Sequence, residues 1–164
     1  MITENFDMGK SRARSVVMMG LFCGLVLAGC SAKTEAQTSE SSAVAATGAL
    51  ETSAGRYEFT PTTCGIYSQD GADDIEIQGP GTAPNGEKFF FELSSTANAM
   101  TIGLGVDRPF ASPERRIQAG RVYSEEFTIV VSGKRLSVAG LILVNENGGS
   151  IDDGATLTID CGAP

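Results

Sequence analysis

From residue 56 to residue 161, large apolar side chains occur at every second position in a series of short runs. Successive side chains of a β-strand point to opposite faces of the sheet, so this alternation indicates strands with one buried face. The alternating side chains are Tyr57 and Phe59; Cys64 and Ile66; Ile75 and Ile77; Phe89, Phe91 and Leu93; Met100, Ile102 and Leu104; Phe127, Ile129 and Val131; Leu136, Val138, Ile142 and Val144; and Leu157, Ile159 and Cys161.

The stretches between these runs are rich in Gly, Asp, Asn and Pro, which favour turns. Ser132–Arg135 has the composition of a tight hairpin turn, and Gly140, inside the longest run, predicts a β-bulge or a close approach of another part of the chain. No window shows a sustained helical period. The sequence therefore predicts an all-β domain of about seven to eight strands, a small antiparallel β-sandwich, with a small barrel as the alternative architecture.

The longest stretch without strand alternation is Val106–Ala119, where Pro109 and Pro113 exclude a regular helix. Arginine and phenylalanine, which are enriched at interface cores, gather in and beside this stretch. We predict a binding site for a protein or glycan partner there, formed by Arg108, Phe110, Arg115, Arg116 and Arg121. The alternative interpretation is that Phe110 is buried and closes one end of the fold.

The N-terminal region has the parts of a secretory signal peptide. The apolar run SVVMMGLFCGLVLA follows three cationic side chains, Lys10, Arg12 and Arg14. At about 13 apolar residues, this run is too short for a stable transmembrane helix. Glu4 and Asp7 are unusual ahead of the cations, so Met8 is an alternative start to Met1. We predict that residues 1–29 are a signal peptide.

The signal ends in Leu27-Ala28-Gly29-Cys30, which resembles the lipobox of bacterial lipoproteins. This resemblance implies cleavage before Cys30 and attachment of diacylglycerol to its thiol. The protein would then be held by lipid in a cell membrane or outer membrane, facing the periplasm or the cell surface. The alternative is an ordinary signal peptide followed by a chance cysteine.

Four cysteines are present, and processing would discard Cys23 and acylate Cys30. Cys64 and Cys161 remain, both in phase with buried strand positions, and an exported compartment permits disulfides. We therefore predict a Cys64–Cys161 disulfide that ties the two ends of the domain together. Two separate buried thiols are the alternative, and two cysteines without histidine do not complete a zinc site.

Residues 30–55 comprise the acylated cysteine and a segment dominated by Ser, Thr, Ala, Glu and Gln, without an aromatic side chain. Such a segment buries too little apolar surface to offset its ordering entropy. We predict a disordered, flexible tether over 30–55 and the β domain over 56–164.

Composition excludes several functions. The formal net charge of −8 disfavours binding to nucleic acid, and the lack of histidine removes the Ser-His-Asp and Cys-His catalytic arrangements. We expect no metal and no cofactor. Carboxylate doublets leave open a small carboxylate-dependent hydrolase, and they lie at Asp73/Asp74, Glu125/Glu126 and Asp152/Asp153.

The layout of lipobox, tether and cysteine-tied β domain resembles the mycobacterial 19 kDa lipoprotein antigen family, with the segments LAGC, DIEIQG, LG and LTIDC. That resemblance implies a surface lipoprotein without catalysis. Ala119-Gly120-Arg121-Val122-Tyr123 also resembles the Ser-Gly-x-x-Tyr loop of membrane-bound lysozyme inhibitors, with Ala119 in place of the serine. We therefore predict a lipid-anchored, non-enzymatic envelope protein with a structural or binding role, and an inhibitor of a secreted hydrolase as the alternative.

Overall fold

A computed structural model describes residues 45–69 and 72–162. The signal peptide, Cys30 and most of the predicted tether lie outside the described residues. The strands are β1 (Thr47–Thr52), β2 (Gly55–Phe59), β3 (Thr63–Gln69), β4 (Ala72–Thr82), β5 (Lys88–Ser94), β6 (Ala99–Leu104), β7 (Arg115–Ala119), β8 (Val130–Ser132), β9 (Arg135–Asn145) and β10 (Ser150–Asp160). Within the described ranges, no helix has the length and apolarity needed to cross a membrane.

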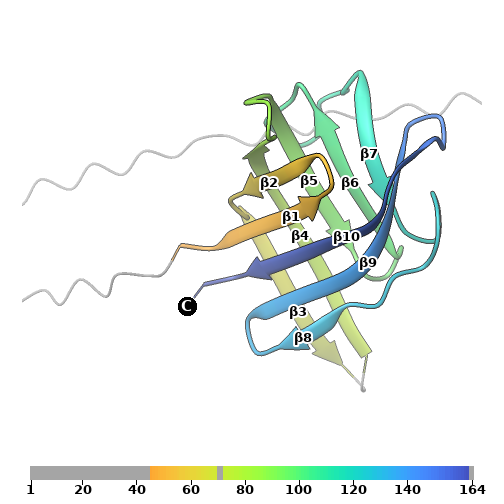
Figure 1. Cartoon of the computed structure of the whole chain (residues 1–164). Coiled ribbons are helices and arrows are strands. Elements are labelled where there is room, and N and C mark those ends of the chain that lie inside the picture. The colour runs from red at the N-terminus through yellow and green to blue at the C-terminus, as the bar shows by residue number, and fades with distance from the viewer. Residues whose placement is uncertain (1–44, 70–71, 163–164) are drawn as a thin grey trace, which may run out of the picture. The chain divides into compact units, whose positions relative to one another are not determined.

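The strands form one antiparallel sheet that closes on itself (Figure 1). The pairing order is β10-β1-β2-β4-β5-β6-β7-β9, and β9 pairs with β10 to complete a barrel of eight strands. Two further strands extend it, because β3 pairs with β4 and β8 pairs with β9. The predicted all-β antiparallel fold is confirmed, and the architecture is the barrel rather than the sandwich. Closure leaves no free edge on the eight-stranded ring.

The core fills the interior of the barrel with the alternating side chains of the strands. Phe59 and Phe91 stack with their ring centroids 4.0 Å apart, and Phe89 meets Phe59 edge to face at 6.4 Å. The largest fully buried side chains are Phe89, Phe91, Leu50, Ile75, Ile77, Met100, Ile102, Leu141, Leu143, Leu157 and Val138. The period-two pattern therefore predicted the buried face correctly for most strands.

The bulge predicted at Gly140 is confirmed. Leu157 of β10 pairs with Val138, and Ala155 pairs with Leu141, so β9 has one residue more than β10 between these pairs. Gly140 lies in this insertion with φ +68°, a conformation that glycine adopts without steric cost. The extra residue reverses the inward face of β9. Leu141 and Leu143 are buried in place of the predicted Ile142, which is only half-buried.

The predicted tether over 30–55 extends too far toward the C-terminus. β1 occupies Thr47–Thr52 and pairs with β10 on one side and β2 on the other. Its sequence contains one large apolar side chain, Leu50, and the inward position beside it is Gly48, which packs against the Phe59 ring. Glycine supplies space rather than apolar surface, so β1 shows too few apolar positions for a period-two signal. The domain begins at about residue 47 instead of residue 56.

Two other segments also differ from the prediction. β7 begins at Arg115, inside the stretch predicted to be irregular, because the restriction imposed by the prolines ends at Pro113. Conversely, Phe127 is buried within a loop, and the strand in that region is confined to Val130–Ser132. β7 has only Ile117 as a large apolar side chain, whereas Phe127, Ile129 and Val131 alternate although most of their segment is a loop.

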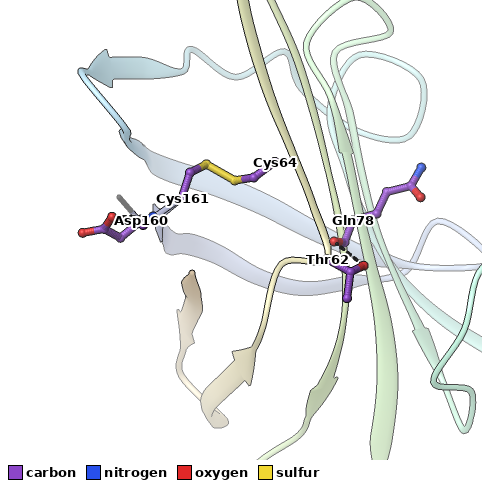
Figure 2. The surroundings of a disulfide bond; sticks show 6 residues. Thr62, Cys64, Gln78, Asp160 and Cys161 are labelled. Carbon is purple, nitrogen blue, oxygen red and sulfur yellow. Dashed lines mark hydrogen bonds between the residues drawn. A yellow bond between two sulfur atoms is a disulfide. The ribbon is translucent and has the colours of Figure 1, made fainter. Parts of the chain in front are cut away.

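The predicted disulfide is confirmed. Cys64 of β3 and Cys161, directly after β10, are bonded, with Cα atoms 5.8 Å apart and 97 residues of separation (Figure 2). β3 lies outside the closed ring, and its backbone pairs with β4 alone among the strands. The disulfide therefore holds this added strand to the last strand of the barrel.

Candidate functional site

The structure divides the predicted partner-binding residues between the two ends of β7. Arg115 and Arg116 begin this strand, whereas Arg121 follows its last residue and donates its backbone N–H to Asn98, in the turn between β5 and β6. Arg108 lies in the loop before β7 and is exposed. The five residues therefore do not form one basic cluster.

Arg115 is engaged in an ion pair with Glu87, which lies in the turn before β5. Its Nη2 atom lies 2.5 Å and 2.7 Å from the two carboxylate oxygens of Glu87. This hydrogen bond raises the pKa of Arg115 and lowers the pKa of Glu87. The backbone N–H of Arg116 donates to Glu146 at 3.1 Å. These contacts connect β7 to adjacent turns, so they give the start of β7 a structural role.

Phe110 is the most exposed large apolar side chain among the described residues. Its relative exposure is 102%, so the alternative in which it closes an end of the fold is wrong. Its φ of +59° lies in the left-handed region, which is unfavourable for a bulky side chain. The loop that carries it is fixed on both sides, by a Lys88–Asp107 ion pair at 2.9 Å and by Pro113 packed over Gly103. A strained and exposed aromatic residue on an anchored loop is a candidate contact for a partner.

We expect Phe110→Asn to leave the fold intact and to raise the free energy of unfolding by about 0.5–1 kcal/mol. Asparagine tolerates the left-handed conformation far better than phenylalanine, and no buried contact of Phe110 is lost. Urea denaturation measures this change, with Phe127→Asn, a substitution of a buried phenylalanine, as the destabilising control. A loss of stability in Phe110→Asn would show that the loop depends on this ring.

An open groove with a volume of about 1020 Å3 crosses the outer wall of the barrel. It extends from β8 over β9, β10, β1 and β2 to β4, and reaches Lys88 at the start of β5 and Asp107 beyond β6. Ala49, Thr158 and Glu58 lie side by side in the strand register at its floor. They alternate with core residues along their strands, so the groove lies on the side of the sheet that faces away from the core.

Ion pairs flank the groove. Arg56 Nε lies 2.8 Å from Glu58, Lys88 Nζ lies 2.9 Å from Asp107, and Arg135 Nε lies 2.8 Å from Asp160. These hydrogen bonds raise the pKa values of Arg56 and Lys88 and lower those of Asp107 and Asp160. Opposite charges thus stabilise each other's ionised form at the rim of the groove.

The groove was missed by sequence analysis because its residues come from seven strands and carry no local motif. The only available signal was the strand alternation itself, which places Glu58, Ser137 and Thr158 on the outward face without showing that this face is hollow. A groove is a property of sheet curvature, which short-range patterns do not encode.

Two other residues singled out from the sequence, Asp152 and Ala119, take part in the structure of the barrel. Asp152 accepts hydrogen bonds from the backbone N–H groups of Ser53 at 2.6 Å and Gly154 at 2.9 Å. Hydrogen bonding by the Ser53 side chain, followed by these backbone bonds, lowers the pKa of Asp152. Ala119, which corresponds to the inhibitory serine of the lysozyme-inhibitor loop, is fully buried and unable to enter a cleft. In the described part of the chain, no three acidic or cysteine side chains gather closely enough to hold a metal ion.

The fold and the groove define a small, disulfide-tied antiparallel barrel with a polar surface groove. Comparisons with protein-family models, with curated protein sequences and with solved structures find no match to this chain.

Proposed function

We propose that this chain is a lipid-anchored, non-enzymatic protein of the cell envelope whose barrel serves as a binding module. The observation that carries the anchoring is the segment LAGC, which ends at Cys30 behind a cationic and apolar leader. The barrel would face the periplasm or the cell surface. Residues 31–46, sixteen in number, connect Cys30 to β1 and span at most about 55 Å.

Export is supported by the disulfide between Cys64 and Cys161. Disulfides form and persist in oxidising compartments outside the cytoplasm, and they are common in small exported domains with limited cores. The bond therefore agrees with a leader that directs the chain across a membrane.

Five carboxylates of the described residues have contacts that suit structural roles. All shifted carboxylate pKa values among the described residues are lowered, at Glu87, Asp107, Glu146, Asp152 and Asp160. The largest cause in each case is a hydrogen bond from an arginine, a lysine or a nearby residue of the fold. A glycosidase-type general acid needs the opposite shift, so these groups are better suited to structural ion pairs.

We expect Cys30→Ser to abolish membrane association of the chain. Serine lacks the thiol that takes up the lipid, and in this proposal the acylated Cys30 is the membrane anchor. Expression of the full chain in a bacterium with a lipoprotein pathway, followed by detergent-phase partitioning, measures the effect. Cys23→Ser is the matched control, because Cys23 lies in the discarded leader and its loss should leave the mature protein in the detergent phase.

The two variants together test the assignment directly. Partition of Cys30→Ser into detergent to the same extent as the unmodified chain would contradict a lipid anchor at this residue. Mass spectrometry of the purified chain provides a second readout, since acylation should appear on a peptide that begins at Cys30.

A further inference from the structure

We propose that the groove on the outer wall of the barrel binds a neutral polyhydroxylated chain, an uncharged glycan of the cell envelope. This inference deepens the proposed binding role and rests on it, but it does not depend on the lipid anchor. The volume of about 1020 Å3 lies at the upper end of the range of roughly 300–1,000 Å3 for small-molecule sites. Such a groove accommodates a segment of several linked sugars.

The charges of the groove favour a neutral ligand. Its lining contains the three cations Arg56, Lys88 and Arg135 and the three anions Glu58, Asp107 and Asp160. Each cation has an anion of this set within 2.9 Å, so the positive charges are already compensated. Recognition of a phosphate or carboxylate group requires charge-assisted donors that are free to turn toward the ligand. An anionic polymer would have to break these pairs or approach the carboxylates.

The hydrogen-bonding capacity of the groove fits hydroxyl groups. Arg135 binds Asp160 through Nε, so this pair does not use its Nη N–H groups, and each carboxylate has lone pairs beyond those used in its pair. A hydroxyl both donates and accepts, so it can bridge such a donor and such an acceptor in one contact. The lining adds further hydroxyls from Thr47, Thr60, Thr82, Ser132, Ser137 and Thr158. Ion pairing also holds the charged side chains in place, which lowers the entropy cost of binding.

The floor of the groove carries one small outward side chain. Ala49 lies between Glu58 and Thr158 in the strand register and is 4% exposed although it lies on the outer wall. Its methyl side chain allows a flat ligand to approach the sheet closely. The apolar C–H face of a sugar ring can lie on this floor while its hydroxyls reach the polar sides.

Phe110 supplies an aromatic surface next to the groove. Asp107 lines the groove and is separated from Phe110 by only two residues, so their Cα atoms are at most about 11 Å apart. The ring of Phe110 is fully exposed, and a sugar face would cover it without loss of polar contacts. A glycan chain can stack one sugar ring on this exposed aromatic side chain while its hydroxyls contact the polar groups of the groove.

The position of the groove disfavours an extended peptide as its ligand. Peptides commonly add a strand to an exposed sheet edge, where the main-chain groups are free. This groove crosses the faces of β9, β10, β1 and β2, whose backbones are paired with each other, and β8, at one end of the groove, pairs with β9 alone. A ligand that lies over the four paired strands therefore contacts side chains rather than main-chain donors and acceptors.

The test uses the purified full-length chain and an array of neutral and anionic oligosaccharides, followed by calorimetry with each oligosaccharide that binds. Thr158→Arg places a large cation in the groove at an exposed position of β10. Thr156→Arg is the matched control, because it adds the same charge two residues away on the same strand and face, outside the lining. We expect binding to at least one neutral oligosaccharide, weakened about tenfold or more by Thr158→Arg and unchanged by Thr156→Arg.

Ser137→Arg provides a second groove variant on β9, with thermal denaturation as the measure of folding for all three proteins. Failure to bind any neutral oligosaccharide, or equal binding by the groove and control variants, would overturn the inference. Binding of anionic oligosaccharides alone would overturn the ligand class while leaving the proposed binding role in place. If no neutral or anionic oligosaccharide binds, and the chain is found in the cytoplasm whether or not Cys30 is present, the proposed function is wrong as well.

Discussion

Removing the Cys64–Cys161 disulfide is expected to lower the free energy of unfolding by about 4–5 kcal/mol, the value that chain entropy assigns to a loop of this length. The two cysteines are 97 residues apart, so the bond constrains most of the unfolded domain. Small domains have only about 5–15 kcal/mol of stability in total. The change is therefore large enough to bring the barrel close to unfolding at ordinary temperatures.

The measurement is urea denaturation of Cys64→Ala/Cys161→Ala against the oxidised protein, with the reduced protein as a second comparison. Alanine avoids placing a hydroxyl beside the core, against which both cysteines pack. The reduced protein and the double variant should have similar midpoints. An oxidised protein whose midpoint does not change on reduction would show that the bond contributes nothing to folding stability.

This bond was predictable from the sequence because cysteine number and strand phase act together. Cys64 shares a face with Ile66, and Cys161 continues the alternation of Leu157 and Ile159, so both thiols were expected at the inner face. The all-β class followed from the same alternation. The choice of a barrel did not, because the pairing of β9 with β10 is that of two consecutive strands and does not distinguish a barrel from a sandwich. Only the pairing of β7 with β9 and β1 with β10 closes the ring.

The segments that sequence analysis missed share a physical cause. β1 directs Gly48 toward the Phe59 ring, and β7 has only Ile117 as a large buried side chain. Where a glycine packs its backbone against an aromatic ring, that position has no apolar side chain, so it adds nothing to an alternating pattern in the sequence. Strands of this kind are stabilised by pairing with neighbours on both sides, which involves residues far away in sequence.

The candidate site was less predictable than the fold. Phe110 is exposed, as a partner-binding role requires, and that role stays a prediction. The grouping of Arg121 with Arg115 and Arg116 was wrong, because proximity in sequence was taken for proximity in space across an unrecognised strand. The groove belongs to the outward faces of several strands. Its polar side chains have the composition of any solvated surface, so only the three-dimensional arrangement reveals it.

The substitution Asn98→Ala is also expected to have a large effect. It should lower the free energy of unfolding by about 3–5 kcal/mol. Asn98 is buried in the turn between β5 and β6, with φ +46°. Its Nδ2 donates to the carbonyl of Phe127 at 2.7 Å, and its Oδ1 accepts from the backbone N–H groups of Phe127 at 3.3 Å and Arg121 at 3.1 Å. Alanine leaves the buried polar groups of Phe127 unpaired, at about 1–3 kcal/mol each, and adds left-handed strain.

The contribution of the hydrogen bonds can be separated from that of the backbone. Asn98→Gly removes the same bonds but accepts positive φ, so it should be less destabilising than Asn98→Ala by about 1 kcal/mol. Asn85→Ala is the control, because Asn85 is an exposed turn residue whose side chain accepts one hydrogen bond, from Glu87. Equal and small effects of all three substitutions in urea denaturation would contradict the role of Asn98. A large effect of Asn98→Ala would show that this buried amide fixes the loop from Gly120 to Phe127. The loop packs tightly on Asn98, because a Cβ at Gly120 would lie only 2.0 Å from the backbone carbonyl oxygen of Asn98.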